Sequence, residues 1–109
     1  MEIFYIYWSN YTHSAQYKIA RLIYDQNRWY FKYNANQIFP AIKDGFRPFP
    51  DLPDIDKIYE SKNLFKVFQT RYQASNSSET LRLMKNSCGD LITDTILINY
   101  VDEQKKMKI

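Results

Sequence analysis

The sequence predicts an α+β domain: a small antiparallel sheet with two to three short helices packed on it. Large apolar side chains alternate with a period of two before Asn34, as in strands, and recur at helical spacing after Ser61. The aromatic content of 17% also favours a sheet, because Tyr and Phe fit a pleated, half-buried surface. The 109 residues are enough for one compact domain, over 1–109, and hardly for two.

The first third of the chain predicts three strands. Residues Glu2–Trp8 are almost all β-branched or aromatic, and a polar loop over 9–16 separates them from a second strand, Tyr17–Tyr24. Asp and Asn in the 25–27 segment favour a turn, since their side chains bond their own backbone. The chain then returns as a third strand, Arg28–Tyr33, and the first strand is expected to join this hairpin in one sheet. One face of the third strand is aromatic, with Trp29, Phe31 and Tyr33.

A short helix is expected between Asn34 and Asp44, because a proline, here Pro40, is tolerated in a first helical turn. Gly45 should end that helix. The segment Phe46–Ile55 is expected to be extended, since a residue before proline is displaced towards β or polyproline geometry.

Two further helices and one strand are predicted for the second half. The first helix has Ser61 as its N-cap and runs to about Tyr72, with Leu64, Phe65, Phe68 and Tyr72 on one face. After the polar loop 73–78, Ser78 should cap a helix through Ser87. Its inward side is expected to hold Leu81, Met84 and Cys88. Gly89 is expected in a left-handed conformation, and 91–101 should return to the sheet as one strand.

Composition indicates a soluble, cytoplasmic protein. The single cysteine, Cys88, has no partner for an internal disulfide, which favours a reducing compartment. No apolar run approaches ~20 residues, and the first residues lack the basic region of a signal peptide, so no membrane span is expected. The net charge is +3 and the basic residues are dispersed, except in the tail with Lys105, Lys106 and Lys108. That tail is a solvated terminus or, alternatively, a phosphate-contacting arm.

The sequence contains no evident catalytic, cofactor or metal site, so an enzyme is not expected. The only histidine, His13, has no orienting group at a suggestive spacing, and Cys88 is expected to be buried filler. The 2 glycines of the chain exclude Gly-rich phosphate loops. Solvated carboxylates are a better interpretation than a Ca²⁺ loop for Asp51, Asp54 and Asp56. We expect Thr93, Asp94 and Thr95 to cap the turn into the last strand.

The most distinctive stretch runs from Gly45 to Arg71 and contains three of the four prolines. Because proline fixes φ before folding, such an aromatic loop loses little conformational entropy when it becomes ordered. It is either a rigid strut that closes a small core or a docking surface. If it docks, the expected partner-contact residues are Phe46, Arg47, Phe49, Asp51 and Leu52, because aromatic and Arg side chains are enriched in interface hot spots.

Four segments resemble a known family. They are YKIARLIYDQNRWYFKY, DGFRPFPDLPD, YESKNLFKVFQTRY and LRLMKNSCGDLITDTI, which together cover most of 17–98. In this order they are similar to the first N-terminal subdomain of HipA-type serine/threonine kinases, and to the stand-alone HipS-like antitoxins of tripartite HipBST toxin–antitoxin systems.

The resemblance implies a protein that is not an enzyme and that neutralises a separate HipA-like (HipT-type) kinase toxin by binding it. It also implies a helix-turn-helix DNA-binding protein in the same complex. A competing hypothesis is a small HIRAN-like nucleic-acid-binding domain, in which Arg28, Arg47 and Arg71 meet phosphates while aromatic rings stack on bases. Direct nucleic-acid binding is not the favoured expectation. A third alternative is a structural accessory domain without activity of its own.

Overall fold

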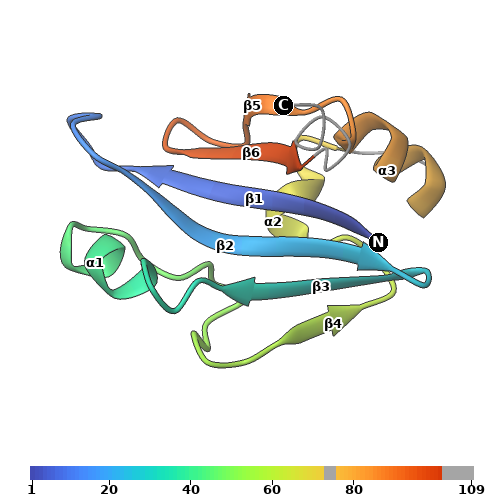
Figure 1. Cartoon of the computed structure of the whole chain (residues 1–109), viewed down its shortest axis with the longest axis horizontal. Helices are drawn as coiled ribbons and strands as arrows, with labels where there is room; N and C mark the ends of the chain where they lie inside the picture. The colour runs from blue at the N-terminus through green and yellow to red at the C-terminus, as the bar shows by residue number, and fades with distance from the viewer. Residues whose placement is uncertain (73–75, 102–109) are drawn as a thin grey trace, which may run out of the picture.

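The computed structural model describes residues 1–72 and 76–101 and confirms the predicted α+β class (Figure 1). Its elements, in chain order, are β1 (Glu2–Ser9), β2 (Gln16–Asp25), β3 (Arg28–Tyr33), α1 (Ile38–Lys43), β4 (Tyr59–Ser61), α2 (Lys66–Gln69), α3 (Ser77–Met84), β5 (Cys88–Leu91) and β6 (Ile96–Val101).

The six strands form one antiparallel sheet in the order β4-β3-β2-β1-β6-β5. The predicted hairpin is present: Asp25 pairs with Arg28, and the two residues between them, Gln26 and Asn27, have φ of 49° and 66°. Positive φ at both central positions matches the twist of the flanking strands. The turn geometry therefore suits the β2–β3 hairpin, and β1 pairs with its β2 edge.

The two faces of the sheet differ because side chains alternate along each strand. The inner face is apolar and buried, with Phe4, Ile6, Trp8, Leu22, Trp29, Phe31, Tyr33, Ile96 and Ile98. In Figure 1, β1 and β2 pass in front of α2, so α2 lies behind the sheet. Buried residues from the helices, such as Ile38 in α1, Phe68 in α2 and Met84 in α3, belong to the same core as the inner face.

The predicted helix over 61–72 is wrong in extent. Ser61 belongs to the edge strand β4, opposite Trp29, and only the single turn Lys66–Gln69 is α-helical. The Ser61 Oγ instead accepts a hydrogen bond from the Asn63 N–H at 3.1 Å, which closes a local turn. The apolar spacing was nevertheless informative, because Leu64, Phe68 and Tyr72 are all buried.

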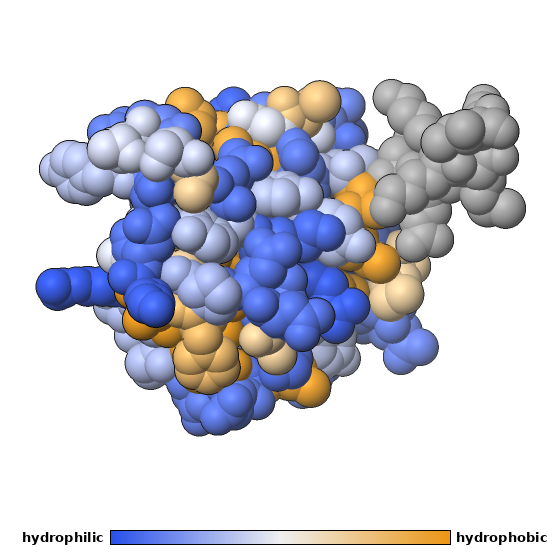
Figure 2. Space-filling model, turned by 60° about the vertical axis from the view of Figure 1, so that its left-hand side comes forward, coloured by the Kyte–Doolittle hydropathy of each residue, from blue (hydrophilic) through white to orange (hydrophobic). Residues whose placement is uncertain are grey.

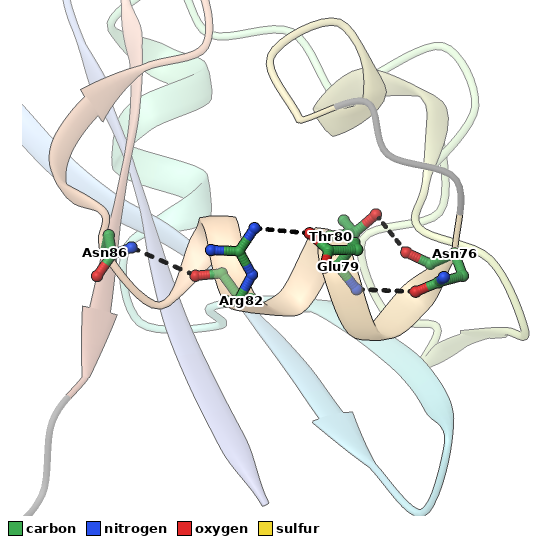
Figure 3. Close-up of polar contacts among 5 residues, drawn as sticks. All are labelled: Asn76, Glu79, Thr80, Arg82 and Asn86. Atoms are coloured by element: carbon green, nitrogen blue, oxygen red, sulfur yellow. Dashed lines mark hydrogen bonds and ion pairs between the residues drawn. The ribbon is translucent and has the colours of Figure 1, made fainter.

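The helix predicted from Ser78 begins one residue earlier and ends at Met84, short of Ser87. Its N-cap is Asn76, whose Oδ1 accepts from the Glu79 N–H at 2.9 Å, while the Thr80 hydroxyl donates to the Asn76 carbonyl at 3.0 Å (Figure 3). Asn76 comes directly before the first turn, where its side chain satisfies an otherwise unpaired N–H, whereas the predicted cap Ser78 lies inside that turn. Farther along, Arg82 pairs with Glu79 at 2.7 Å.

Of the predicted last strand over 91–101, only Ile96–Val101 is the continuous strand β6, while Leu91 ends β5 and a turn separates the two strands of this hairpin. The turn between them confirms the expected capping role of Thr93, whose Oγ1 accepts from the N–H groups of Thr95 and Ile96 at 3.3 and 3.2 Å. Gly89 has the expected positive φ, 74°, but lies at a register irregularity of β5 instead of a helix end. Cys88 also lies in β5 and is exposed, so its predicted burial on a helix is wrong.

Candidate binding surfaces

The proline-rich loop is fastened to the sheet through one tyrosine. The buried Tyr33 hydroxyl donates to the carbonyl of Leu52 at 2.7 Å and accepts from the N–H of Phe49 at 2.9 Å. A buried backbone group needs such a partner, because leaving it unpaired costs free energy. Burial also raises the pKa of Tyr33 well above its ordinary value of 10.0, so the hydroxyl keeps its proton. Tyr33 therefore holds two points of the loop at once.

Three of the five predicted contact residues are core side chains in this chain. Phe46, Phe49 and Leu52 are 4%, 8% and 1% exposed. The Phe49 ring packs between those of Phe31 and Phe68, with centroids 6.1 and 6.4 Å away. In the free chain this part of the loop is thus a strut and presents none of the three as an exposed anchor.

The other two predicted contact residues, Arg47 and Asp51, are exposed. Between them lies the exposed Pro50, so the outer side of the loop presents one cation and one carboxylate on a backbone restrained by proline. We call this set, Arg47, Pro50 and Asp51, the loop rim. It is the part of the predicted contact segment that is available to a partner without unfolding the core.

The arginines of the nucleic-acid hypothesis do not form one cluster. The Arg28 guanidinium lies 3.6 Å from Glu60 across β3 and β4, and that of Arg71 lies 3.7 Å from Asp90 in β5. Arg47 belongs to the loop rim. Each of the first two cations thus has a carboxylate neighbour of its own, and the three come from separate parts of the fold.

A polar cluster links the residues after α2 to β5. The Tyr72 hydroxyl donates to Asp90 Oδ2 at 2.9 Å, and the Arg71 Nη2 lies 3.7 Å from the same oxygen. Burial is the main reason why the pKa of Tyr72 is raised well above its usual 10.0. A neutral hydroxyl that donates to a paired carboxylate fixes geometry and supplies no free base, so this arrangement is structural.

His13 lies beside the β5–β6 turn. Together with Tyr11, Thr93, Asp94 and Thr95 it lines a hollow of about 440 Å³. The fold thus brings Asp94 and the hydroxyls of Thr93 and Thr95 close to His13, which sequence spacing did not predict. However, no hydrogen bond joins the imidazole to Asp94 within residues 1–72 and 76–101, and the His13 side chain is exposed. A nucleophile–base pair needs such a bond to orient the imidazole.

One acidic residue of the loop, Asp54, is fixed by local hydrogen bonds. Asp54 Oδ1 accepts from the Asp56 N–H at 2.9 Å, and the Asp54 N–H donates to the Tyr59 hydroxyl at 2.7 Å. Among the described residues, no group of three or more His, Cys, Asp and Glu could hold a metal ion. Nor does the described part of the chain include a helix that is long and apolar enough to cross a membrane.

The outer face of the sheet was not identified from the sequence. We call it the open face: it is the side opposite the core, made of alternate residues on β1, β2, β3 and β6. Its members are the tyrosines Tyr5, Tyr7 and Tyr30, the cations Lys18, Arg21 and Lys32, the apolar residues Ile3, Ile23, Leu97 and Val101, the polar Asn99, and, at one end, Asp25 and Arg28. The period-two pattern predicts two faces of large side chains, but it does not show that one of them stays free of other elements.

Large exposed apolar side chains are scattered over the described elements, as Phe39 in α1, Leu83 in α3 and Leu91 in β5 illustrate. Figure 2 likewise shows one side of the molecule where apolar patches are small and separated by hydrophilic side chains.

Comparisons of the chain with protein-family models, curated proteins and solved structures found no match.

Proposed function

We propose that the chain is a non-enzymatic antitoxin that binds and neutralises a separate HipA-like serine/threonine kinase. The proposal includes a cytoplasmic location and a helix-turn-helix DNA-binding protein in the same complex. It rests on the resemblance of four segments to the first N-terminal subdomain of HipA-type kinases. The residues that would contact the kinase are part of the same proposal.

In the structure the four segments contact one another. Tyr33, at the end of the hairpin segment, bonds the proline-rich loop at Phe49. The Phe49 ring in turn meets Phe68 in the third segment at 6.4 Å, and Tyr72 bonds Asp90 in the fourth at 2.9 Å. The four segments therefore form one connected unit, so a partner that recognises them would meet a single folded surface.

The loop rim is the contact site that we assign to the kinase. Arg is enriched in hot spots, and a loop that is already ordered loses little entropy on binding. Arg47 and Asp51 are exposed on a segment held from beneath by Tyr33, so they keep their positions in the free protein. Phe46, Phe49 and Leu52 act on this site indirectly, through the shape of the loop.

Calorimetric titration of the chain with a HipA-like kinase tests the assignment. Arg47→Ala should weaken binding by about 2 kcal/mol and leave the melting temperature unchanged, since the side chain is exposed. Lys43→Ala, an exposed lysine at the end of α1, is the matched control and should bind like the wild type. Equal affinity of both variants would remove the loop rim from the interface. Growth under kinase expression that does not improve with the chain present would contradict the antitoxin proposal itself.

A further inference from the structure

Three cations that are dispersed in the sequence come together on the open face. Arg21 in β2 lies directly opposite Lys32 in β3, and Lys18 in β2 lies opposite Tyr7 in β1. Like charges in directly opposed positions destabilise a strand pair, so an anion over this site would relieve a repulsion already present. The open face is therefore complementary to a polyanion.

Carboxylates lie only at one end of this surface within the described residues. Asp25 pairs in register with Arg28, and Glu60 lies 3.6 Å from the same guanidinium. Arg28 is thus between the two acidic side chains of this end. The other three cations lie further along β2 and β3, in rows shared with tyrosines and aliphatic residues.

Two hollows on the open face each combine a tyrosine with a cation. One, of about 90 Å³, is lined by Arg21, Ile23, Tyr30 and Lys32, with Ile58 at its border. The other, of about 380 Å³, lies over β1, β5 and β6, and Tyr7 and Lys18 contribute to its wall. In the second hollow the Lys18 ammonium lies 4.0 Å from the centroid of the Tyr5 ring, so a cation already occupies a position over an aromatic face there.

We propose that the open face binds single-stranded nucleic acid, with phosphates at Lys18, Arg21 and Lys32 and bases against Tyr7 and Tyr30. Proteins that bind single strands combine a cationic track with aromatic rings, because every base offers a flat face for stacking. A duplex hides those faces in its own stack, so it would meet the cations but not the rings. This site shares no residue with the loop rim, and it does not depend on the kinase proposal.

Fluorescence anisotropy with labelled oligo(dT) and oligo(U) of about 12 nucleotides tests this proposal on the full chain. Saturable binding of either strand is expected, and the tighter one identifies the preferred type of strand. With three phosphate contacts, the logarithm of the association constant should fall with the logarithm of salt with a slope of about −2. A duplex of the same length and a poly-glutamate peptide of similar charge are expected to compete at least tenfold less well. Equal competition by either one would overturn the proposal.

Variants separate the two components of the site. Replacing both Arg21 and Lys32 by Gln should reduce the magnitude of the salt slope by about 1.4, whereas Lys66→Gln, an exposed lysine of α2, should not change it. Tyr30→Leu keeps apolar bulk but removes a ring, and should weaken binding at least about fivefold. Tyr11→Leu is its matched control, since this tyrosine is 97% exposed in the β1–β2 loop, outside the open face.

The basic tail is the main competing source of phosphate binding. Replacing Lys105, Lys106 and Lys108 by Gln should change the affinity less than twofold if the open face is the site. Loss of binding in this triple variant, with full binding in the Arg21 and Lys32 double variant, would overturn the proposal. Absence of saturable binding to both oligonucleotides at low salt would do the same. Circular dichroism of each variant confirms that the fold is intact before its affinity is compared.

Discussion

Removing one oxygen atom, in Tyr33→Phe, should destabilise the whole protein. The ring stays in place, but the N–H of Phe49 and the carbonyl of Leu52 lose the buried hydroxyl that bonds both at 2.9 and 2.7 Å. Each buried backbone group left unpaired costs about 1–3 kcal/mol. The expected loss of unfolding free energy is therefore about 2–6 kcal/mol, a large part of the about 5–15 kcal/mol typical of a domain.

Urea denaturation followed by circular dichroism measures this loss, and thermal unfolding should show a melting temperature lower by about 8 °C or more. Tyr30→Phe is the matched control: it is the same substitution on the same strand, but on the open face, where the hydroxyl makes no hydrogen bond to any residue of 1–72 or 76–101. Its effect should stay within about 0.5 kcal/mol. If both variants unfold at the same urea concentration, the Tyr33 hydroxyl does not hold the loop and the strut interpretation is refuted.

Three further predictions concern the core, a helix cap and pH. Phe49→Ala should cost about 3–5 kcal/mol in chemical denaturation, because it removes a buried ring; a cost below about 1 kcal/mol would contradict burial. Asn76→Ala should cost about 1 kcal/mol and Ser78→Ala almost nothing in the same assay, since only Asn76 caps α3. Burial raises the pKa of Tyr33 and Tyr72 in the folded state, so above pH 10 these tyrosines ionise in the unfolded chain but stay protonated in the folded one. The stability that they contribute below pH 10 should therefore fall by about 1.4 kcal/mol per pH unit for each of them. Tyr33→Phe should remove half of that tyrosine contribution, and an unchanged slope would contradict it.

Local patterns were enough to predict the fold class and the first three strands. The Gln26–Asn27 turn and the alternation in β1 and β3 depend on neighbours in sequence, which a single chain displays directly. The edge strand β4 was missed because three residues give no recognisable alternation, and its pairing with Phe31 is a tertiary interaction. Ser61 had the composition of an N-cap, but the sheet edge determined its conformation.

The candidate sites were less predictable than the fold. The loop composition is typical both of a strut and of a docking surface, and only the Tyr33 hydrogen bonds, which span 16 and 19 residues, distinguish these roles for Phe49 and Leu52. The open face escaped notice for a related reason: Lys18, Arg21 and Lys32 become neighbours only through strand register. The net charge of the chain does not show which cations become neighbours.

The most direct test of the account is the interaction with the kinase. Purified chain should bind a HipA-like kinase in a saturable manner, and kinase activity should fall in proportion to the fraction bound. The same titration with Arg47→Ala should require more of the chain for equal inhibition, while Lys43→Ala should match the wild type. Full kinase activity at saturating concentrations of a folded chain, with no heat of binding, would contradict the antitoxin proposal.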